Sequence, residues 1–416
     1  MNPWLVLVMS ALVAFVASGA RMSFGVFVGP LEETFNISRS VGVLPLSVSM
    51  LVWGVLQPFA GAYMDAHGPR RVILPSVVLI AVGFVAAASA QNMWQLIVGY
   101  SLFVGGASSG LAVAAFSVLM SRWFGVKQRG KAIGFALAGI PMGSIIFAPI
   151  TSYVAENFGW RMAWLFLAAV MIFVAMPLAY YFLREPPQST ETSPAATSRG
   201  GMFLNTEVRR ALKTRAYWMM LLAYFGCGTS GLFLQGHLPA IGLWYGFSPQ
   251  VGANALGLVG VGGAIGAILG GWISDRFGRY PALMGGYFLR GVGFFLLAEA
   301  VSDVNSFYFA SLMAGLPIFV TITVTQTLIY EIFGAGIAGR MLGLTFVLHQ
   351  VGSSAGPYLG GRAFEALQSY EAPLLVGSGV LWLSTFWAWR LRTAAQNMAP
   401  RDEAPGLQPA QLPHID

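Results

Sequence analysis

The sequence predicts an all-α membrane protein with twelve transmembrane helices, arranged as two pseudo-symmetric six-helix bundles. Three observations support this fold class. The chain of 416 residues is 56% hydrophobic and only 9% charged, which would leave a water-soluble domain with far too much exposed apolar surface. Twelve apolar windows recur along the chain, each near the roughly 20 residues needed to cross about 30 Å of hydrocarbon. One short sequence pattern also occurs twice, about half the chain apart.

The apolar windows fall into two sets separated by a polar interval. The first set lies near residues 5–28, 40–60, 72–90, 95–121, 132–154 and 163–183. The second set lies near residues 216–236, 251–273, 281–300, 305–329, 338–360 and 373–391. The N-terminal stretch has no basic leader, so we interpret it as the first membrane helix and not as a cleaved signal.

These windows suggest four regions. The polar interval is rich in Pro, Ser, Thr and Ala and cannot bury a core, and the C-terminal end looks similarly unstructured, with Pro400, Pro405, Pro409 and Pro413. We therefore expect an N-terminal six-helix bundle over 1–183, a cytoplasmic linker over 184–215, a C-terminal six-helix bundle over 216–392 and a disordered cytoplasmic tail over 393–416.

The repeated pattern places an aspartate four residues after a glycine and a second glycine three residues after the aspartate. Its copies span Gly61–Arg71, around Asp65, and Gly271–Arg279, around Asp275. Both resemble the loops after the second and eighth helices of the major facilitator superfamily of secondary transporters. The first copy departs from the family at Ala66, where a basic residue is common, whereas the second fits closely. The resemblance implies two homologous halves that rock about a central site.

Residues 21–27, 121–134 and 339–352 are similar to bacterial carriers near the monocarboxylate porters and the oxalate/formate exchangers. The resemblance implies a small organic anion as substrate, a monocarboxylate by analogy, moved by proton symport or by exchange. Monocarboxylate porters bind the carboxylate with an arginine eight residues before the eighth-helix loop aspartate. That position is Ala267 here, so the identity of the substrate stays open.

The distribution of basic residues predicts the orientation. Most Lys and Arg residues of the loops lie on the side that carries both chain ends, and the opposite loops hold only Arg39, Arg161 and Arg362. The positive-inside rule then places both termini in the cytoplasm of a protein in the inner cell membrane. The net charge of +7 reflects this topology, and we expect no nucleic-acid partner. The basic segment Val208–Arg215 is expected to lie on anionic lipid.

Arg21 and Arg290 are the basic residues that remain inside predicted helices. An intramembrane charge costs at least a few kcal/mol and is kept for pairing or function. Arg21 lies about 25 Å along the first helix, where it either snorkels to the outer headgroups or faces a central cavity and binds a carboxylate. The family resemblance favours the cavity. The ninth helix of the family packs outside the cavity, so we expect Arg290 to be a structural intramembrane charge.

Other polar residues lie within the predicted helices. His349 and Gln350, in the eleventh helix, are either satisfied packing residues or ligands for the anion, with His349 also a candidate carrier of the coupled proton. The weaker candidate substrate ligands are Gln235, Gln326, Tyr330 and Ser108.

We expect the repeated loops to gate the cytoplasmic side. A carboxylate at a helix end pairs with nearby arginines or with a neighbouring helix N-terminus, and such contacts would hold this side shut in the outward-open state. In the alternative interpretation the arginines only fix the topology. The predicted gating residues are Asp65, Gly68, Arg70, Arg71, Arg129, Asp275, Arg276, Gly278 and Arg279.

Glycines crowd several helices, including Gly134, Gly139 and Gly143 in the fifth. Lipid supplies no hydrophobic driving force between helices, so membrane helices pack through small residues that let their backbones approach closely. We therefore expect tight helix packing at these positions.

The sequence contains no phosphate-binding loop, and its four histidines and single cysteine are scattered. We expect no metal, nucleotide or other cofactor and no enzymatic activity. The expected partners are a small organic anion, protons and the lipid bilayer, with the protein as a monomer. Two other interpretations remain open: a multidrug or metabolite exporter of the same fold, and a non-transporting membrane sensor.

Overall fold

The computed structural model of the protein describes residues 2–185 and 206–396. Within these ranges every regular element is a helix. Ten helical stretches of the described chain are long and apolar enough to cross a membrane. Two further passes, the broken helix over residues 93–123 and the long helix α18 (Ala335–Leu367), complete the predicted twelve. The predicted all-α membrane fold is confirmed.

The first half contains several interrupted passes. Its elements are α1 (Pro3–Met22), η1 (Ser23–Phe27), α2 (Val28–Phe35), α3 (Arg39–Gly42), α4 (Leu44–His67), α5 (Arg70–Ser89), α6 (Met93–Gly99), η2 (Tyr100–Gly105), α7 (Gly106–Ser108), α8 (Val113–Trp123), α9 (Val126–Phe158), α10 (Trp160–Val170), η3 (Met171–Ala175) and α11 (Met176–Phe182).

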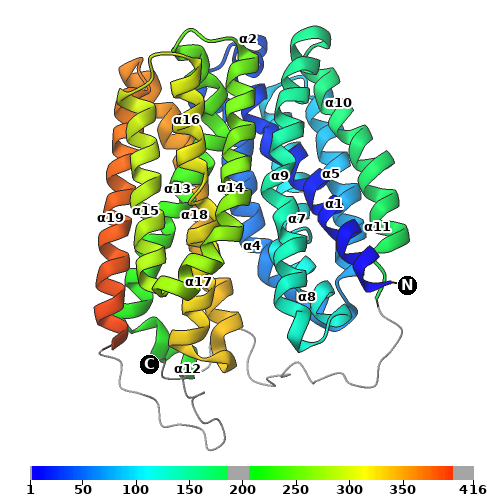
Figure 1. The fold of residues 1–416 in the computed structure, drawn as a ribbon. Coiled ribbons are helices and arrows are strands. Elements are labelled where there is room, and N and C mark those ends of the chain that lie inside the picture. Colours follow the sequence, from blue (N-terminus) through cyan, green and yellow to red (C-terminus); the bar gives the residue numbers. More distant parts are fainter. Residues whose placement is uncertain (1, 186–205, 397–416) are drawn as a thin grey trace, which may run out of the picture.

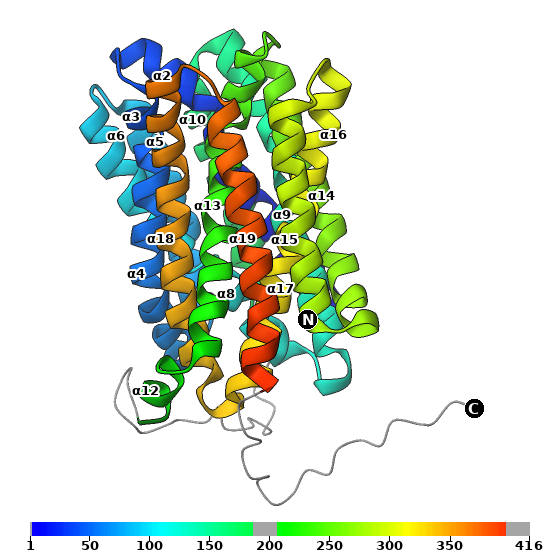
Figure 2. The same ribbon diagram turned by 90° about the vertical axis from the view of Figure 1, so that its left-hand side faces the viewer.

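The second half is more regular. Besides α18, its elements are α12 (Thr206–Leu212), α13 (Arg215–Trp244), α14 (Pro249–Phe277), α15 (Arg279–Glu299), α16 (Val304–Gly315), α17 (Ile318–Phe333) and α19 (Glu371–Gln396). We call the face that carries α12 the lower face, because α12 lies at the bottom of Figures 1 and 2, and the opposite face the upper face.

The first and fourth passes are not continuous α-helices. After α1 the chain takes a 3₁₀ turn, η1, before it continues as α2. The fourth pass contains the π-type segment η2 and an interruption between α7 and α8. Irregular backbone is tolerated at membrane depth only where protein groups or water satisfy it. Both interruptions lie close to the pocket around Arg21 that is described below.

Each half has its own hydrophobic core. One buried cluster draws on residues between 6 and 183, and the other on residues between 208 and 391 together with Ala148. Figure 1 shows the two bundles side by side, with α9 and α14 adjacent at the front, and Figure 2 shows α4 next to α18. The halves therefore meet along two seams, α9 with α14 and α4 with α18.

Small residues let both seams close. A side chain at Gly260 of α14 would overlap Ser144 of α9, and a Cβ atom at Gly54 of α4 would lie 2.9 Å from Cβ of Gln350 in α18. Such close approach gives smooth contact between helices where lipid supplies no hydrophobic drive. The predicted role of small residues in packing holds at these positions.

The repeated pattern forms the same backbone in both halves, at the lower face. Gly68 joins α4 to α5 with φ 87° and ψ 154°, and Gly278 joins α14 to α15 with φ 92° and ψ 158°. Residues other than glycine are strained in this conformation. This explains why the pattern keeps a glycine three residues after the aspartate.

The basic segment of the predicted linker is partly helical. In α12, Val208 and Ala211 are buried, whereas Arg209 and Arg210 are exposed at the lower face. The rest of the predicted linker, residues 186–205, and the tail from residue 397 onward lie outside the described residues. The last helix, α19, ends at Gln396, a few residues beyond the predicted end of the bundle.

Candidate functional site

An aromatic bridge joins the two halves at the centre of the molecule. The Trp53 ring of α4 meets the Phe346 ring of α18 edge-on, with ring centroids 5.4 Å apart. Phe346 in turn stacks on His349, one turn along the same helix, at 6.0 Å. The indole of Trp53 donates a 2.8 Å hydrogen bond to Gln57 Oε1, which fixes its orientation. Polar groups of both halves are therefore held around one rigid aromatic pair.

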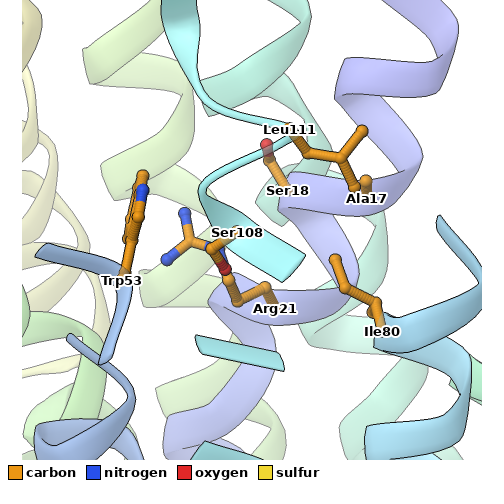
Figure 3. A pocket seen from close by; sticks show the side chains of 7 residues that line it. All are labelled: Ala17, Ser18, Arg21, Trp53, Ile80, Ser108 and Leu111. Atoms are coloured by element: carbon orange, nitrogen blue, oxygen red, sulfur yellow. The ribbon is translucent and has the colours of Figure 1, made fainter. Parts of the chain in front are cut away.

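Arg21 lies on the N-terminal side of this bridge. Its guanidinium carbon is 4.6 Å from the centroid of the Trp53 ring, a cation–π contact that stabilises a partly desolvated charge. Figure 3 shows the guanidinium between Trp53 and Ser108, pointing into the molecule. The structure thus puts Arg21 at an internal pocket and not at an outer membrane surface. The pocket has a volume of about 10 Å³ and is lined by Ala17, Ser18, Arg21, Trp53, Ile80, Ser108 and Leu111.

No acidic side chain of the described residues pairs with Arg21. Among the described residues the ion pairs involve other arginines, and none reaches Arg21. A guanidinium presents five N–H donors in a planar fork that matches a carboxylate. An unpaired guanidinium at membrane depth is therefore a site that favours an anion.

The backbone around Arg21 is held by the other half. Gln235 of α13 donates a 3.2 Å hydrogen bond from Nε2 to the Arg21 carbonyl. At Gly25 of η1 any side chain would overlap the Gln235 carbonyl, so the absence of a Cβ lets η1 and α13 touch. Gln235, predicted as a weak ligand, thus serves here to fix the backbone beside Arg21.

His349 and Gln350 are brought together as expected. Nδ1 of His349 lies 3.1 Å from Oε1 of Gln350 and 3.4 Å from the Ser353 hydroxyl, and the His349 ring lies 4.3 Å from the Tyr224 ring. The Gln350 amide extends to the first half, where Nε2 is 3.6 Å from Sδ of Met50. His349 and Gln350 therefore lie at the α4–α18 seam, next to the aromatic bridge of Trp53 and Phe346.

The remaining predicted ligands differ in their placement. Ser108 lines the Arg21 pocket, although its hydroxyl donates to the Val104 carbonyl at 2.7 Å. Gln326 is partly buried in α17. Tyr330 is 50% exposed near the lower end of α17, so the structure does not bring it to the pocket.

The lower face holds the predicted gating residues, and the contacts described for Arg70 and Arg279 lie within one half. Arg70 donates a 2.8 Å hydrogen bond to the Tyr180 carbonyl. Arg279 binds Asp275 at 2.5 Å and Glu331 at 3.1 Å. Arg276 is exposed, as is Arg71. The structure does not describe the side chains of Asp65 and Arg129.

Arginines nevertheless gather at the lower face of the first half. A cavity of about 400 Å³ opens there, lined by His67, Arg70, Arg71, Arg184 and Glu185. Glu185 also pairs with Arg122 at 2.7 Å. This basic cluster ties the connection between α4 and α5 to the end of α11.

Arg290 is placed deep in the second half. It is 0% exposed, and Nη1 lies 3.4 Å from the sulfur of Cys227 in α13. Its Nε and Nη2 atoms are buried without a hydrogen-bond partner in the described structure. The guanidinium faces α13 and not the Arg21 pocket, and its nearest polar neighbour was not foreseen from the sequence.

A polar chain that the sequence did not predict closes the upper face. Arg39 of α3 pairs with Glu32 and donates a 2.8 Å hydrogen bond to the Tyr370 hydroxyl. Tyr370 contacts Nδ1 of His237 at 3.0 Å, and Nε2 of His237 contacts the Pro357 carbonyl at 2.7 Å. Burial raises the pKa of the Tyr370 hydroxyl, so it remains a donor. We call these residues, Glu32, Arg39, His237, Pro357 and Tyr370, the upper latch.

The proton positions in the upper latch follow from its geometry. The Pro357 carbonyl only accepts, so Nε2 of a neutral His237 carries the hydrogen and Nδ1 accepts from Tyr370. Arg39 then donates to Tyr370, Tyr370 to His237, and His237 to Pro357. A second contact lies nearby, where the Ser40 amide donates to Glu365 Oε1 at 2.6 Å. The sequence signal for the latch was Arg39, a basic residue in a connection with few of them, preceded by Glu32 and Glu33.

Comparison with known proteins gives a family profile and several relatives. The profile of the Major Facilitator Superfamily matches residues 10–357 and again residues 237–413. The MFS-type transporter YcxA of Bacillus subtilis (strain 168) is 24% identical over 88% of this chain and 90% of its own. Monocarboxylate transporter 13 of Rattus norvegicus is 26% identical over 91% of this chain and 88% of its own.

Two further similarities concern a carboxylate carrier and a solved structure. The oxalate:formate antiporter of Oxalobacter formigenes is 24% identical over 68% of this chain and 66% of its own. The crystal structure of a bacterial homologue of the human lysosomal transporter Spinster, in an inward-facing and occupied conformation, superposes with a TM-score of 0.68. It covers 95% of this chain and 97% of its own at 14% identity, a likeness of fold alone.

Proposed function

Because this chain belongs to the Major Facilitator Superfamily, we propose that it is a secondary active transporter of a small organic anion, a monocarboxylate in the first instance. The observation that carries the proposal is Arg21, a guanidinium at an internal pocket with no acidic partner among the described residues. Two relatives named for carboxylates, the oxalate:formate antiporter and monocarboxylate transporter 13, support the same class of substrate.

Arg21 supplies the anion ligand that the eighth helix lacks. The porter arginine position is Ala267 in α14, so that helix offers no cation there. Arg21 provides a forked cation from the first pass instead, with the Trp53 ring against one face. The pocket of about 10 Å³ has room for about one water, so a carboxylate would enter the fork only after the halves move, with an apolar tail against Trp53.

Transport would proceed by alternating access. The upper latch joins the halves, whereas the ion pairs at the lower face lie within one half in the described chain. The upper latch is therefore a contact that must break for the upper face to open. Both termini lie in the cytoplasm of the inner membrane, as the basic loops favour, so the upper face is the outer one. Coupling is by proton symport or exchange, and the carrier acts as a monomer in the bilayer without enzymatic activity or a cofactor.

Counterflow in proteoliposomes tests the proposal. Purified protein is reconstituted with an unlabelled carboxylate inside, and uptake of the same labelled carboxylate is followed over a panel that includes lactate, pyruvate, formate and oxalate. We expect saturable counterflow for at least one monocarboxylate and none in the Arg21→Gln variant. Counterflow of hydrophobic cations instead of carboxylates would favour the exporter. Specific binding without counterflow of any compound would favour a sensor.

A further inference from the structure

The buried guanidinium of Arg290 lacks a carboxylate partner. In the described chain, the ion pairs formed by carboxylates involve Arg39, Arg122, Arg279 and Arg362. Arg290 is 0% exposed, and its Nε and Nη2 atoms have no hydrogen-bond partner there. Leaving a buried charge unneutralised costs several kcal/mol. A nearby group that ionises to an anion would remove most of this cost.

The sulfur of Cys227 is the group in contact with this charge. It lies 3.4 Å from Nη1 of Arg290 and is 2% exposed. One turn further along α13, Gly231 has no side chain, and a Cβ there would lie 2.9 Å from Nη2 of Arg290. The missing side chain at Gly231 thus leaves room on α13 for the guanidinium from α15.

Other contacts of the sulfur suit both of its protonation states. The Thr321 hydroxyl of α17 lies 3.3 Å from the sulfur and donates to the Ile318 carbonyl at 2.8 Å, so it accepts from a thiol and would turn to donate to a thiolate. His349 of α18 packs beside Cys227: its ring lies 4.3 Å from the Tyr224 ring, one turn earlier on α13, and a Cβ at Gly228, the residue after Cys227, would overlap the His349 carbonyl. The Nδ1 atom of His349 faces the Gln350 oxygen, which only accepts. In the neutral ring Nδ1 therefore carries the hydrogen and Nε2 carries the lone pair. A thiol beside an imidazole and a guanidinium is the arrangement that favours ionisation.

We propose that Cys227 is a proton-binding site: its thiolate neutralises Arg290 inside the membrane, and the sulfur takes up and releases the proton coupled to transport. This deepens the proposed function and rests on it. Loading forms an S–H bond between the sulfur lone pair and a proton from water, and unloading breaks that bond. No electron is transferred.

The site accounts for coupling between a proton and an anion. With the thiolate present, the charges of Cys227 and Arg290 cancel. With the thiol present, the positive charge of Arg290 is unbalanced and favours an anion at the centre. His349 connects the two regions, because it packs beside Cys227 on α13 and stacks on Phe346, which contacts Trp53 and so Arg21. The other titratable groups facing the sulfur in the described chain are Tyr224 and Tyr287.

The thiolate itself is tested without substrate. Cys227 is the single cysteine of the chain, so the difference in ultraviolet absorbance between the protein and its Cys227→Ser variant reports the thiolate directly. We expect the thiolate band at neutral pH, its loss on acidification, and its loss at neutral pH in Arg290→Met. Arg290→Lys keeps the charge and is expected to keep the band, as is Arg21→Met, which removes the other intramembrane arginine. Identical spectra for the protein and Cys227→Ser at neutral pH would overturn the proposal, even if Arg290→Met fails to fold.

Transport then tests the role of the proton. We expect Cys227→Ser to lose carboxylate accumulation driven by a pH gradient and to retain counterflow, which needs no net proton movement. Accumulation at the original level in Cys227→Ser and Cys227→Ala would exclude Cys227 as the proton carrier. A lowered carboxylate affinity in Arg290→Met, with no thiolate band in the unmodified protein, would mean that Arg290 binds the substrate itself. If the unmodified protein shows no counterflow of any carboxylate, the proposed function and the coupling role of Cys227 both fail. The thiolate band in the ultraviolet difference spectrum still tests whether Cys227 and Arg290 form an ion pair.

Discussion

Arg39 and Tyr370 are 331 residues apart in the sequence, yet Nη1 of Arg39 donates a 2.8 Å hydrogen bond to the Tyr370 hydroxyl. Arg39 belongs to the first half, and Tyr370 to the short connection between α18 and α19 in the second. A hydrogen bond that involves a charged group contributes about 1.5–3 kcal/mol when it is well made. The contact is therefore strong enough to bias the equilibrium between a closed and an open upper face.

Replacing Tyr370 by Phe should open the upper face more often. The change removes the bond from Arg39 and leaves Nδ1 of His237 without its donor, so we expect the open population to rise about tenfold or more. Distances between spin labels at Glu33 and Ala366, carried on non-canonical amino acids so that Cys227 is unaltered, measure this shift. Both positions are exposed at the upper ends of α2 and α18.

Tyr358→Phe is the matched control for this prediction. Tyr358 lies on α18, is 39% exposed and takes no part in the upper latch. Its replacement should leave the distance distribution unchanged. Equal distributions for Tyr370→Phe and Tyr358→Phe would show that the latch does not set the conformational equilibrium.

Two substitutions of Arg21 should show how much of the carboxylate affinity comes from its charge and how much from the planar shape of the guanidinium. Arg21→Gln removes the charge, and we expect carboxylate affinity to fall roughly 10- to 100-fold, as for loss of a charge-assisted hydrogen bond. Arg21→Lys keeps the charge but not the planar fork or the stacking on Trp53, so we expect an intermediate loss. Ligand-induced shifts of the melting temperature of the purified variants give these affinities. If Arg21→Lys and Arg21→Gln bind as tightly as the original protein, the carboxylate is held elsewhere.

The fold was predictable because it depends on local signals. Apolar windows set the passes, and the φ of 87° at Gly68 and 92° at Gly278 explains why the repeated pattern was visible at all. The broken fourth pass was not predicted, although Ser109 and Gly110 lie at the interruption before α8, because small residues in a membrane helix equally indicate close packing. Hydropathy records how apolar a segment is but not how its backbone is wound.

The sequence predicted a residue of the candidate site only where that residue was unusual in its own segment, without knowledge of its contacts. Arg21 stood out because a charge in an apolar helix is rare. The upper latch did not, since the role of Arg39 depends on a tyrosine in the other half. Arg290 was interpreted as a structural charge because the ninth helix of the family packs outside the cavity, and its contact with Cys227, 63 residues away in the sequence, was not foreseen. Contacts between distant segments are set by packing, which composition and spacing do not encode.

Asp275→Asn should slow transport without weakening substrate binding. Asp275 and Glu331 both pair with Arg279, so this cluster ties the lower ends of α14, α15 and α17 into one unit. An exposed ion pair contributes only about 0.2–1 kcal/mol to stability, so the melting temperature should change little. We expect a lower maximal rate of counterflow and an unchanged carboxylate affinity. Glu207→Gln, on the exposed side of α12 at the same face, is the control, and a parallel loss of rate and affinity in Asp275→Asn would contradict a gating role.

Two glycines of α9 should respond in opposite ways to alanine. A Cβ at Gly143 would overlap the Phe15 carbonyl and Gly19 of α1, whereas a Cβ at Gly134 meets nothing within 4 Å. Overpacking typically costs about 1–3 kcal/mol, so Gly143→Ala should lower the melting temperature and displace α1. Gly134→Ala should raise it slightly, because alanine favours a helix by up to about 1 kcal/mol over glycine.

The same pair links packing to function. Arg21 lies on α1 just beyond Gly19, so a displaced α1 would move the guanidinium away from Trp53. Gly143→Ala should therefore also reduce carboxylate counterflow, while Gly134→Ala should transport normally. Thermal unfolding and counterflow measured on both variants check this. Equal melting temperatures would show that α1 and α9 are not in close contact, and a stable Gly143→Ala protein with full counterflow would show that the position of Arg21 does not depend on this contact.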